Sequence, residues 1–74
     1  MAYNYRKLKG RIVEIYGTQS AFAEAMGKSE RAISLKLNNK VKFDQDEIEL
    51  ACSLLHIPID HAHVYFFTVD SQFA

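Results

Sequence analysis

The sequence predicts an all-α fold, in which about five short helices form a compact bundle and residues 1–74 make a single domain. Two kinds of pattern lead to this prediction. Apolar residues recur at the spacing of a helix face along most of the chain. Residues that commonly start or stop helices separate these periodic stretches, and they are serine, threonine, asparagine, aspartate and glycine. A chain of 74 residues is also too short for more than one domain.

The first helix is expected from apolar residues at helical spacing, with basic residues on its other faces. These apolar residues are Tyr5, Leu8, Ile12, Ile15 and Tyr16. Asn4 is placed to cap this helix, and Tyr3 with Leu8 has the spacing of a hydrophobic staple. Gly17 follows the last apolar residue and is expected to end the helix.

Two short helices joined by a tight turn are predicted over residues 18–38. Thr18 is a suitable cap for the segment QSAFAEAM, and Gly27 suits the left-handed residue that stops a helix without a steric penalty. Ser29 then caps a third helix, which is expected to run to about Leu37. This pattern predicts a helix-turn-helix, in which Phe22, Met26 and Ile33 form the shared core.

The fourth helix is predicted over residues 45–56. Asp44 and Glu47 have the spacing of a capping box, and Phe43 with Ile48 has the spacing of a staple. Apolar residues cover a wide arc of this helix, which predicts that it contacts neighbours on two sides.

The segment HVYFFTV near the end of the chain is ambiguous, because its aromatic residues favour a strand. However, Asp60 precedes it, and Ile59 with Val64 has the spacing of a staple around an aspartate cap. We therefore predict a short fifth helix over residues 61–67, followed by a loose or extended tail from about residue 68. The alternative is a strand over residues 64–69, pairing with a second chain.

Charge is distributed unevenly, although the net charge is zero. Residues 1–42 hold all nine lysines and arginines and three acids, a net charge of +6. Residues 43–74 hold six acids and no lysine or arginine, a net charge of −6. Such a chain can present a basic face to phosphate and keep its acids on the far side. Alternatively, the two halves neutralise each other in the folded chain.

The stretch TQSAFAEAMGKSERAISLKLNNK, Thr18 to Lys40, resembles the helix-turn-helix of the phage Cro and CI repressors, the Xre-like family with the lambda-repressor-like fold. The ending LNNKVKFDQDEIELACSLLHIPI, followed by YFFT, is similar to small phage repressors of Gram-positive hosts. The resemblance implies a transcriptional regulator that binds double-stranded operator DNA with its third helix in the major groove. The alternative is a protein-interaction module of the same fold, as an antirepressor would be.

The resemblance also assigns roles to individual residues. The base-reading positions are Ser29, Glu30, Arg31, Ser34 and Leu35. The phosphate-contacting positions are Gln19, Lys36, Asn38, Lys40 and Lys42. The chemistry agrees for Arg31, which could donate two hydrogen bonds to guanine for roughly 1–3 kcal/mol of discrimination. Glu30 could accept from cytosine, or it could simply favour the helix N-terminus through the helix dipole.

A homodimer on DNA is expected, because one helix-turn-helix reads too few base pairs to select a site. The proposed dimerisation residues lie in the acidic half, and they are Leu50, Leu54, Tyr65, Phe66 and Phe67. Together they would make an exposed apolar patch. The alternative is that the aromatic residues close one end of the core.

Catalysis is not expected, and no cofactor, metal ion or small-molecule substrate is implied. His61 and His63 are two residues apart, so on a helix they point to different sides and do not chelate together. Cys52 is alone and lies among apolar residues, which suggests a buried thiol in a reducing compartment. No apolar run reaches the length of a membrane span, and MAYNYRKLKG lacks the apolar segment of a signal peptide. A cytoplasmic location, in a bacterial or phage-infected cell, is therefore expected.

Overall fold

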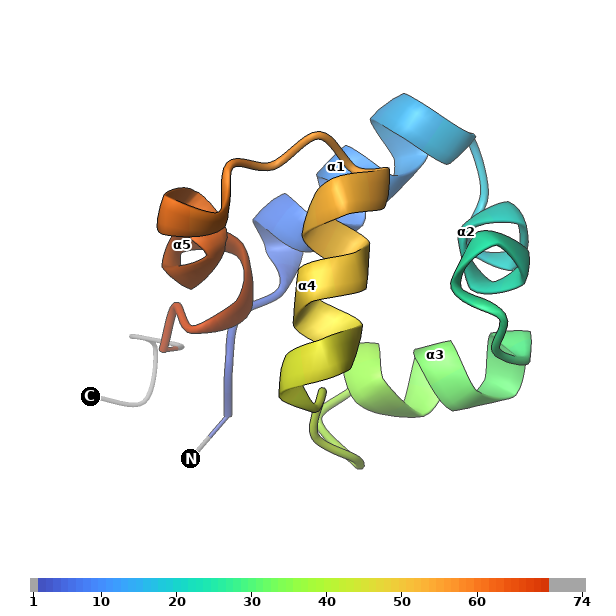
Figure 1. Ribbon diagram of the computed structural model, residues 1–74. Helices are drawn as coiled ribbons and strands as arrows, with labels where there is room; N and C mark the ends of the chain where they lie inside the picture. Colours follow the sequence, from blue (N-terminus) through green and yellow to red (C-terminus); the bar gives the residue numbers. More distant parts are fainter. Residues whose placement is uncertain (1, 70–74) are drawn as a thin grey trace.

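The computed structural model describes residues 2–69. Within them it has five α-helices, no named strand and one short 3-10 turn (Figure 1). The helices are α1 (Arg6–Tyr16), α2 (Gln19–Met26), α3 (Glu30–Leu37), α4 (Gln45–Leu54) and α5 (Ala62–Phe66), and the turn η1 (Ile59–His61) leads into α5. The predicted all-α class is confirmed. None of the helices in this range is long and apolar enough to cross a membrane.

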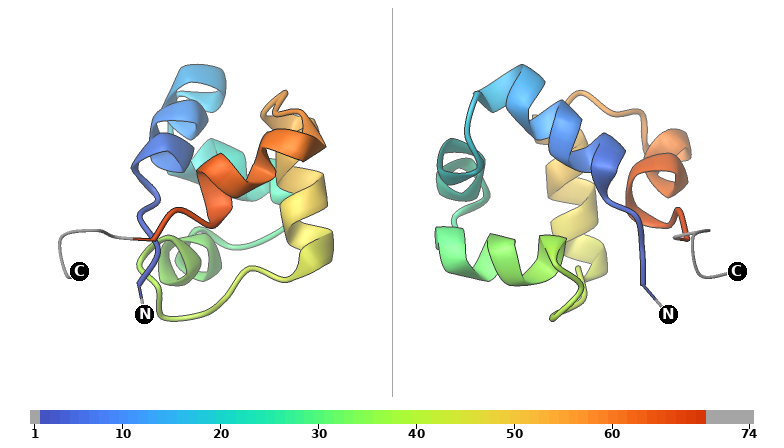
Figure 2. Two further views of the ribbon diagram at one scale, coloured as in Figure 1. Left: turned by 90° about the vertical axis from the view of Figure 1, so that its left-hand side faces the viewer. Right: turned by 180° about the vertical axis from the view of Figure 1, so that it is seen from behind.

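The helices surround one core. Helix α4 lies at the front of Figure 1, and the view from behind in Figure 2 shows α1 on the opposite side. The α2–α3 pair lies at one end of the molecule, where α2 packs on α1 and α4. Helix α5 lies at the other end, packed between α1 and α4. This arrangement leaves α3 at an edge of the molecule.

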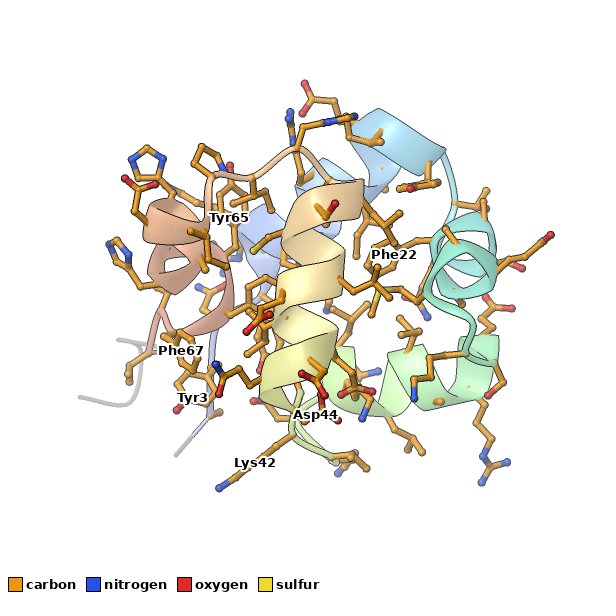
Figure 3. All side chains as sticks on the ribbon, viewed as in Figure 1. Tyr3, Phe22, Lys42, Asp44, Tyr65 and Phe67 are labelled. Carbon is orange, nitrogen blue, oxygen red and sulfur yellow. The ribbon has the colours of Figure 1, made fainter. Side chains whose placement is uncertain are left out.

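The core consists of apolar side chains from every helix. Its largest fully buried members are Phe22, Phe66, Leu8, Ile12, Ile33 and Leu55. Phe22 lies near the middle of the molecule in Figure 3. Burial of each such side chain stabilises the fold by about 1.5–3 kcal/mol relative to exposure, so this set is the main source of stability.

Three helix starts were predicted correctly because each depends on a side chain close in sequence. The side-chain oxygens of Thr18 and Ser29 accept hydrogen bonds of 3.1 Å from backbone N–H groups three residues further on. Asp44 and Glu47 form a complete capping box, with distances of 2.7 Å and 2.9 Å. Gly27 has a φ of 70° and ends α2 in the left-handed conformation, as expected.

The ends of α1 differ slightly from the prediction. Asn4 does accept a hydrogen bond from the backbone N–H of Arg6, at 2.9 Å, but the helix cap is Tyr5. Gly17 ends the helix with a φ of 82°. Ile15 was expected in the apolar stripe, but its side chain is 37% exposed near the end of α1.

The chain after α4 departs further from the prediction. Helix α4 ends at Leu54 instead of His56, because His56 adopts a φ of 56° and the chain turns there. This turn directs Ile57 into the core. Asp60 forms no cap, because it lies within η1, and Ile59 is 64% exposed, so it forms no staple with Val64.

The strand considered for residues 64–69 does not form. Helix α5 continues to Phe66, and the extended residues after it pair with the beginning of the same chain. The backbone N–H of Asn4 donates to the carbonyl of Thr68 at 2.7 Å, and Tyr3 forms an isolated antiparallel bridge with Val69. The predicted tail extends past Val69, outside the described residues.

Candidate functional site

The α2–α3 pair consists of two short helices joined by a tight turn, as the sequence predicted. The two helices pack against each other across the turn at Gly27. Phe22, Met26 and Ile33 are buried at their junction, as predicted. Ala23 is 1% exposed, and its small side chain permits the close approach of the neighbouring helix. The pair therefore holds α3 rigidly at the edge of the molecule.

The predicted base-reading residues share one outward face of α3. Glu30 and Arg31 are exposed, Ser34 and Leu35 follow one turn later, and Ser29 is the N-cap. Residues four apart lie on the same side of a helix, so the structure brings this set together. Among residues 2–69, Arg31 has no carboxylate partner. The face thus combines one free cation, one acid and one apolar side chain.

The predicted phosphate contact of Lys36 requires an outward side chain, but the Lys36 side chain points inward. Its ammonium lies 3.2 Å from Glu47 Oε1 and donates to the carbonyl of Lys42 at 3.3 Å. Only 11% of its side chain is exposed. Glu47 also has Lys28 Nζ 3.5 Å from its Oε2. A buried carboxylate needs a counter-charge, and folding places Lys36 where it supplies one. The expected outward orientation is wrong, and the acidic and basic halves pair at this point.

The other predicted phosphate-contacting residues lie on different elements and differ in exposure. Gln19 is half-buried at the first residue of α2, and Lys40 and Lys42 are exposed in the loop after α3. Asn38 caps α3, because its side-chain amide donates to the carbonyl of Ser34 at 2.8 Å. Asn38, Lys40 and Lys42 therefore follow the end of α3, whereas Gln19 lies at the start of α2.

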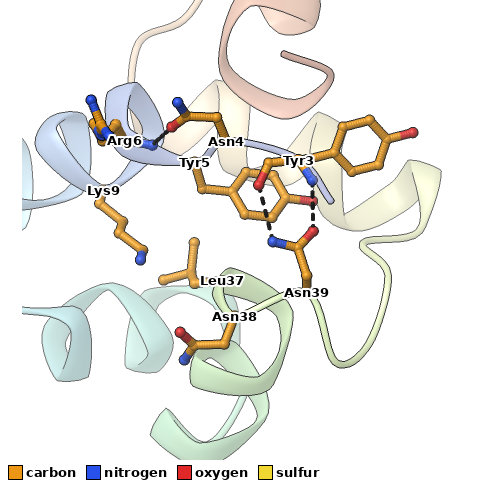
Figure 4. Close-up of a pocket in the computed structure, with 8 residues that line it drawn as sticks. All are labelled: Tyr3, Asn4, Tyr5, Arg6, Lys9, Leu37, Asn38 and Asn39. Carbon is orange, nitrogen blue, oxygen red and sulfur yellow. Dashed lines mark hydrogen bonds between the residues drawn. The ribbon is translucent and has the colours of Figure 1, made fainter. Parts of the chain in front are cut away.

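Asn39 ties this loop to the start of the chain, a role that the sequence did not suggest. Its side chain accepts from the backbone N–H of Tyr3 and donates to the carbonyl of Tyr3, both at 3.0 Å (Figure 4). The φ of Asn39 is 63°, a left-handed conformation that asparagine adopts more readily than most residues. Consecutive asparagines suggested a helix stop, but not this long-range partner.

A second surface, which we call the α4–α5 groove, lies between the start of α4 and the segments that flank α5. The lining residues are Phe43, Gln45, Ile48, Glu49, Ile59 and Phe67, around a volume of about 440 Å³. Ile59 is 64% exposed and Phe67 is 50% exposed. Figure 3 shows Phe67 beside Tyr3, and the two ring centroids are 5.9 Å apart in an edge-on arrangement.

The α4–α5 groove lies on the acidic half of the chain. Glu49 lines it, and Asp46 and Asp60 are exposed on α4 and η1. Residues 43–69 contain no lysine or arginine. The groove is therefore mainly apolar, with one carboxylate in its lining and further acids on the same half of the chain. Sequence reasoning missed it because its residues come from three separated segments, and an isolated exposed isoleucine carries no local signal.

The five residues predicted for dimerisation do not form one patch. Phe66 is 1% exposed and belongs to the core, so its expected place at an interface is wrong. Leu54 and Tyr65 are half-buried against the core. Leu50 is exposed but lines a different hollow, and Phe67 belongs to the α4–α5 groove. The physical reason is that successive residues of a helix point about 100° apart, so Tyr65, Phe66 and Phe67 face different sides.

Two titratable side chains are affected by burial. Burial raises the pKa of the Cys52 thiol. Burial, with a smaller contribution from Tyr3, also raises the pKa of Tyr5. Within the described range, no three or more histidine, cysteine, aspartate or glutamate side chains are grouped to hold a metal ion. The surfaces with distinct chemistry are therefore the outward face of α3 and the α4–α5 groove.

Comparison with known proteins places the chain in a family. Residues 1–69 match the family described as "Protein of unknown function (DUF739)". The chain belongs to the DUF739 family. No curated protein matches it.

A solved structure is similar to this DUF739 chain over most of its length. It is the solution structure of the modulator of repression (MOR) of the temperate bacteriophage TP901-1 from Lactococcus lactis. The two share 49% sequence identity over 90% of each chain, with a TM-score of 0.80. This finding agrees with the predicted likeness to regulators of phages. Membership of the Cro and CI repressor family stays a prediction.

Proposed function

We propose that this DUF739 chain regulates repression in a phage by binding a DNA-binding repressor protein through the α4–α5 groove. The observation that carries the proposal is a mainly apolar groove with two exposed apolar side chains on a chain 49% identical to a modulator of repression. A modulator acts on repression that another molecule performs. The chain would work without catalysis, in the cytoplasm of the infected bacterial cell.

The groove has the properties of a protein-binding surface. Ile59 is 64% exposed and Phe67 is 50% exposed. Phe43 and Ile48 form an apolar floor beside them. A partly filled apolar hollow accepts the anchoring side chains that contribute most of the binding energy in interfaces.

Charge complementarity indicates which surface of the repressor it binds. A repressor contacts DNA with lysines and arginines that neutralise phosphates. Glu49 in the lining and Asp60, next to Ile59, offer negative charge to such a basic surface. Because the groove and DNA would then bind the same surface, occupation by this chain releases the operator.

A competition assay tests this proposal. The repressor of the phage that encodes the chain is bound to fluorescent operator DNA, and the chain is added while anisotropy reports release. We expect the unmodified chain to release the DNA, and Ile59→Ala or Phe67→Ala to raise the required concentration about tenfold or more.

Val13→Ala is the matched control, because Val13 is 59% exposed on α1 and does not line the groove. It should release DNA like the unmodified chain. Equal effects of Ile59→Ala and Val13→Ala, or full activity of both groove variants, would contradict the assignment of the groove.

Direct binding of operator DNA is the second candidate function. Arg31 favours it, because this exposed cation of α3 has no carboxylate partner within residues 2–69. Lys40 and Lys42 are exposed in the adjoining loop. Glu30 and the inward orientation of Lys36 oppose it, since they leave α3 with less positive charge than the sequence suggested.

DNA binding without a repressor distinguishes the two candidates. If α3 reads an operator, Arg31→Ala should weaken the best site by about 1–3 kcal/mol and relax preference at one base pair in each half-site. Sedimentation of the DNA complex should then show two copies of the chain. Unselective, weak binding by the unmodified chain would remove this candidate and leave the repressor-binding proposal intact.

A further inference from the structure

A cleft at the C-terminal end of α3 contains two cations, Arg6 and Lys9, that neither candidate function uses. It has a volume of about 250 Å³ and lies between the N-terminal segment, the first turn of α1 and the end of α3 (Figure 4). Its polar lining side chains include Asn4, Arg6, Lys9 and Asn38. No carboxylate lines it.

The two cations of the cleft are unneutralised in the described part of the chain. Arg6 and Lys9 are both exposed, and neither has an ion-pair partner within residues 2–69. Figure 4 shows the Lys9 ammonium directed toward Leu37 and Asn38, across the cleft. The carbonyl oxygen of the Asn4 side chain is engaged by the N–H of Arg6, which leaves its amide N–H groups as donors. The Lys9 ammonium is thus the charge that points into the cleft, and Arg6 adds a second positive charge at its rim.

The walls of the cleft are held in place from both sides. Asn39 fixes the backbone of Tyr3 through two hydrogen bonds of 3.0 Å. The backbone N–H of the next residue, Asn4, donates to the carbonyl of Thr68 at 2.7 Å. The side chain of Asn38 is fixed on the carbonyl of Ser34 at 2.8 Å. The cleft is therefore formed before any ligand arrives, which reduces the entropy lost on binding.

We propose that this cleft binds a phosphate group, and that the backbone of duplex DNA supplies it. An oxyanion with several acceptor oxygens can accept from the Lys9 ammonium, and the positive charge of Arg6 at the rim favours its approach. Exposed Lys40 directly follows Asn39, so a duplex at the cleft also meets this cation. Such a contact is independent of sequence and of the repressor-binding groove. It holds the regulator on DNA close to a bound repressor.

Salt-dependent binding to duplex DNA of random sequence tests the proposal. Lys9→Gln should lower the slope of log affinity against log salt by about 0.9, so the variant loses about 3.5-fold less affinity between 50 and 200 mM salt. Lys7→Gln is the matched control, because Lys7 is exposed on the same helix but does not line the cleft. It removes the same charge and should leave the slope closer to that of the unmodified chain. Equal slope changes in the two variants would overturn the proposal.

A second measurement separates DNA from small phosphate compounds. Amide NMR shifts of Asn4, Lys9 and Asn39 are followed during titration with inorganic phosphate, sodium acetate or sodium chloride at equal ionic strength. Saturable shifts with phosphate, absent in Lys9→Gln, support the site. If they occur without any binding of DNA, the site remains and its ligand is a free phosphate compound, so the DNA source is overturned. Equal shifts with acetate or chloride, or none with phosphate and no slope change, would overturn the site.

Discussion

Replacing Glu47 with glutamine tests the contact through which the acidic and basic halves of the chain meet. Glutamine has nearly the same shape, and its Oε1 can still accept from the backbone N–H of Asp44, as Glu47 does at 2.9 Å. The substitution therefore removes mainly the negative charge that faces Lys36 at 3.2 Å and Lys28 at 3.5 Å.

The burial of these groups determines the expected loss of stability. Lys28 has 43% of its side chain exposed, so its pair with Glu47 contributes little. Lys36 and Glu47 are 11% and 8% exposed, and removing one partner of a buried pair costs about 3–5 kcal/mol. Because Lys36 keeps its hydrogen bond to the carbonyl of Lys42, we expect the lower end, about 3 kcal/mol. Domains of this size have a free energy of unfolding of about 4–11 kcal/mol, so the loss is a large fraction of it.

Urea unfolding followed by circular dichroism measures this change, and thermal unfolding should show a midpoint about 12–24 °C lower. Glu14→Gln is the matched control, because Glu14 is 66% exposed in a 2.8 Å pair with Arg11. It should cost less than about 1 kcal/mol. Adding Lys36→Met to Glu47→Gln should restore part of the lost stability, because no buried cation is then left unpaired. A loss below about 1 kcal/mol for Glu47→Gln, or additive effects in the double variant, would refute the reasoning.

Three further predictions concern the core, the N-terminal segment and the thiol. Phe66→Ala should lower the free energy of unfolding by about 3–5 kcal/mol, and unchanged stability in urea would place Phe66 outside the core. Asn39→Ala should lower the free energy of unfolding by about 1–3 kcal/mol, because two hydrogen bonds to Tyr3 are lost. Asn39→Gly loses the same bonds but adopts the positive φ without strain, so the difference between the two variants in urea gives the cost of that strain. Cys52 should react with a thiol reagent no faster than the chain opens, because it is 3% exposed and burial raises its pKa above the ordinary 9.0. Its contribution to stability is complete below about pH 9 and is lost as the pH rises further, so a stability curve that rises above pH 9 would contradict this cause.

Most helix boundaries could be predicted from short-range patterns. The caps at Thr18 and Ser29 and the capping box of Asp44 and Glu47 join groups three residues apart, so their bonds form wherever a helix begins. The stop at Gly27 depends on one residue that tolerates a positive φ. The end of α4 was predicted two residues too late, because the turn at His56 depends on the burial of Ile57 and not on a local stop signal.

The candidate surfaces could be predicted only in part. The outward side of α3 follows from helical spacing, which predicted that the exposed Arg31 and Leu35 lie beside the half-buried Ser34. The orientation of Lys36 could not be predicted from spacing, since it is decided by Glu47, which belongs to another helix. For the same reason the aromatic run near the C-terminus did not reveal that Phe66 is buried whereas Phe67 is exposed.

The sequence by itself determined where most helices start, which residues form the core between α2 and α3, and that the positive and negative charges lie in different halves of the chain. Those properties depend on neighbours within one or two turns, or on composition alone. Tertiary structure decided which charges remain free, how the α4–α5 groove is assembled, and how Asn39 reaches Tyr3 across 36 positions. These features depend on burial and on Coulomb interactions between groups that meet only when the chain folds, so no local pattern encodes them.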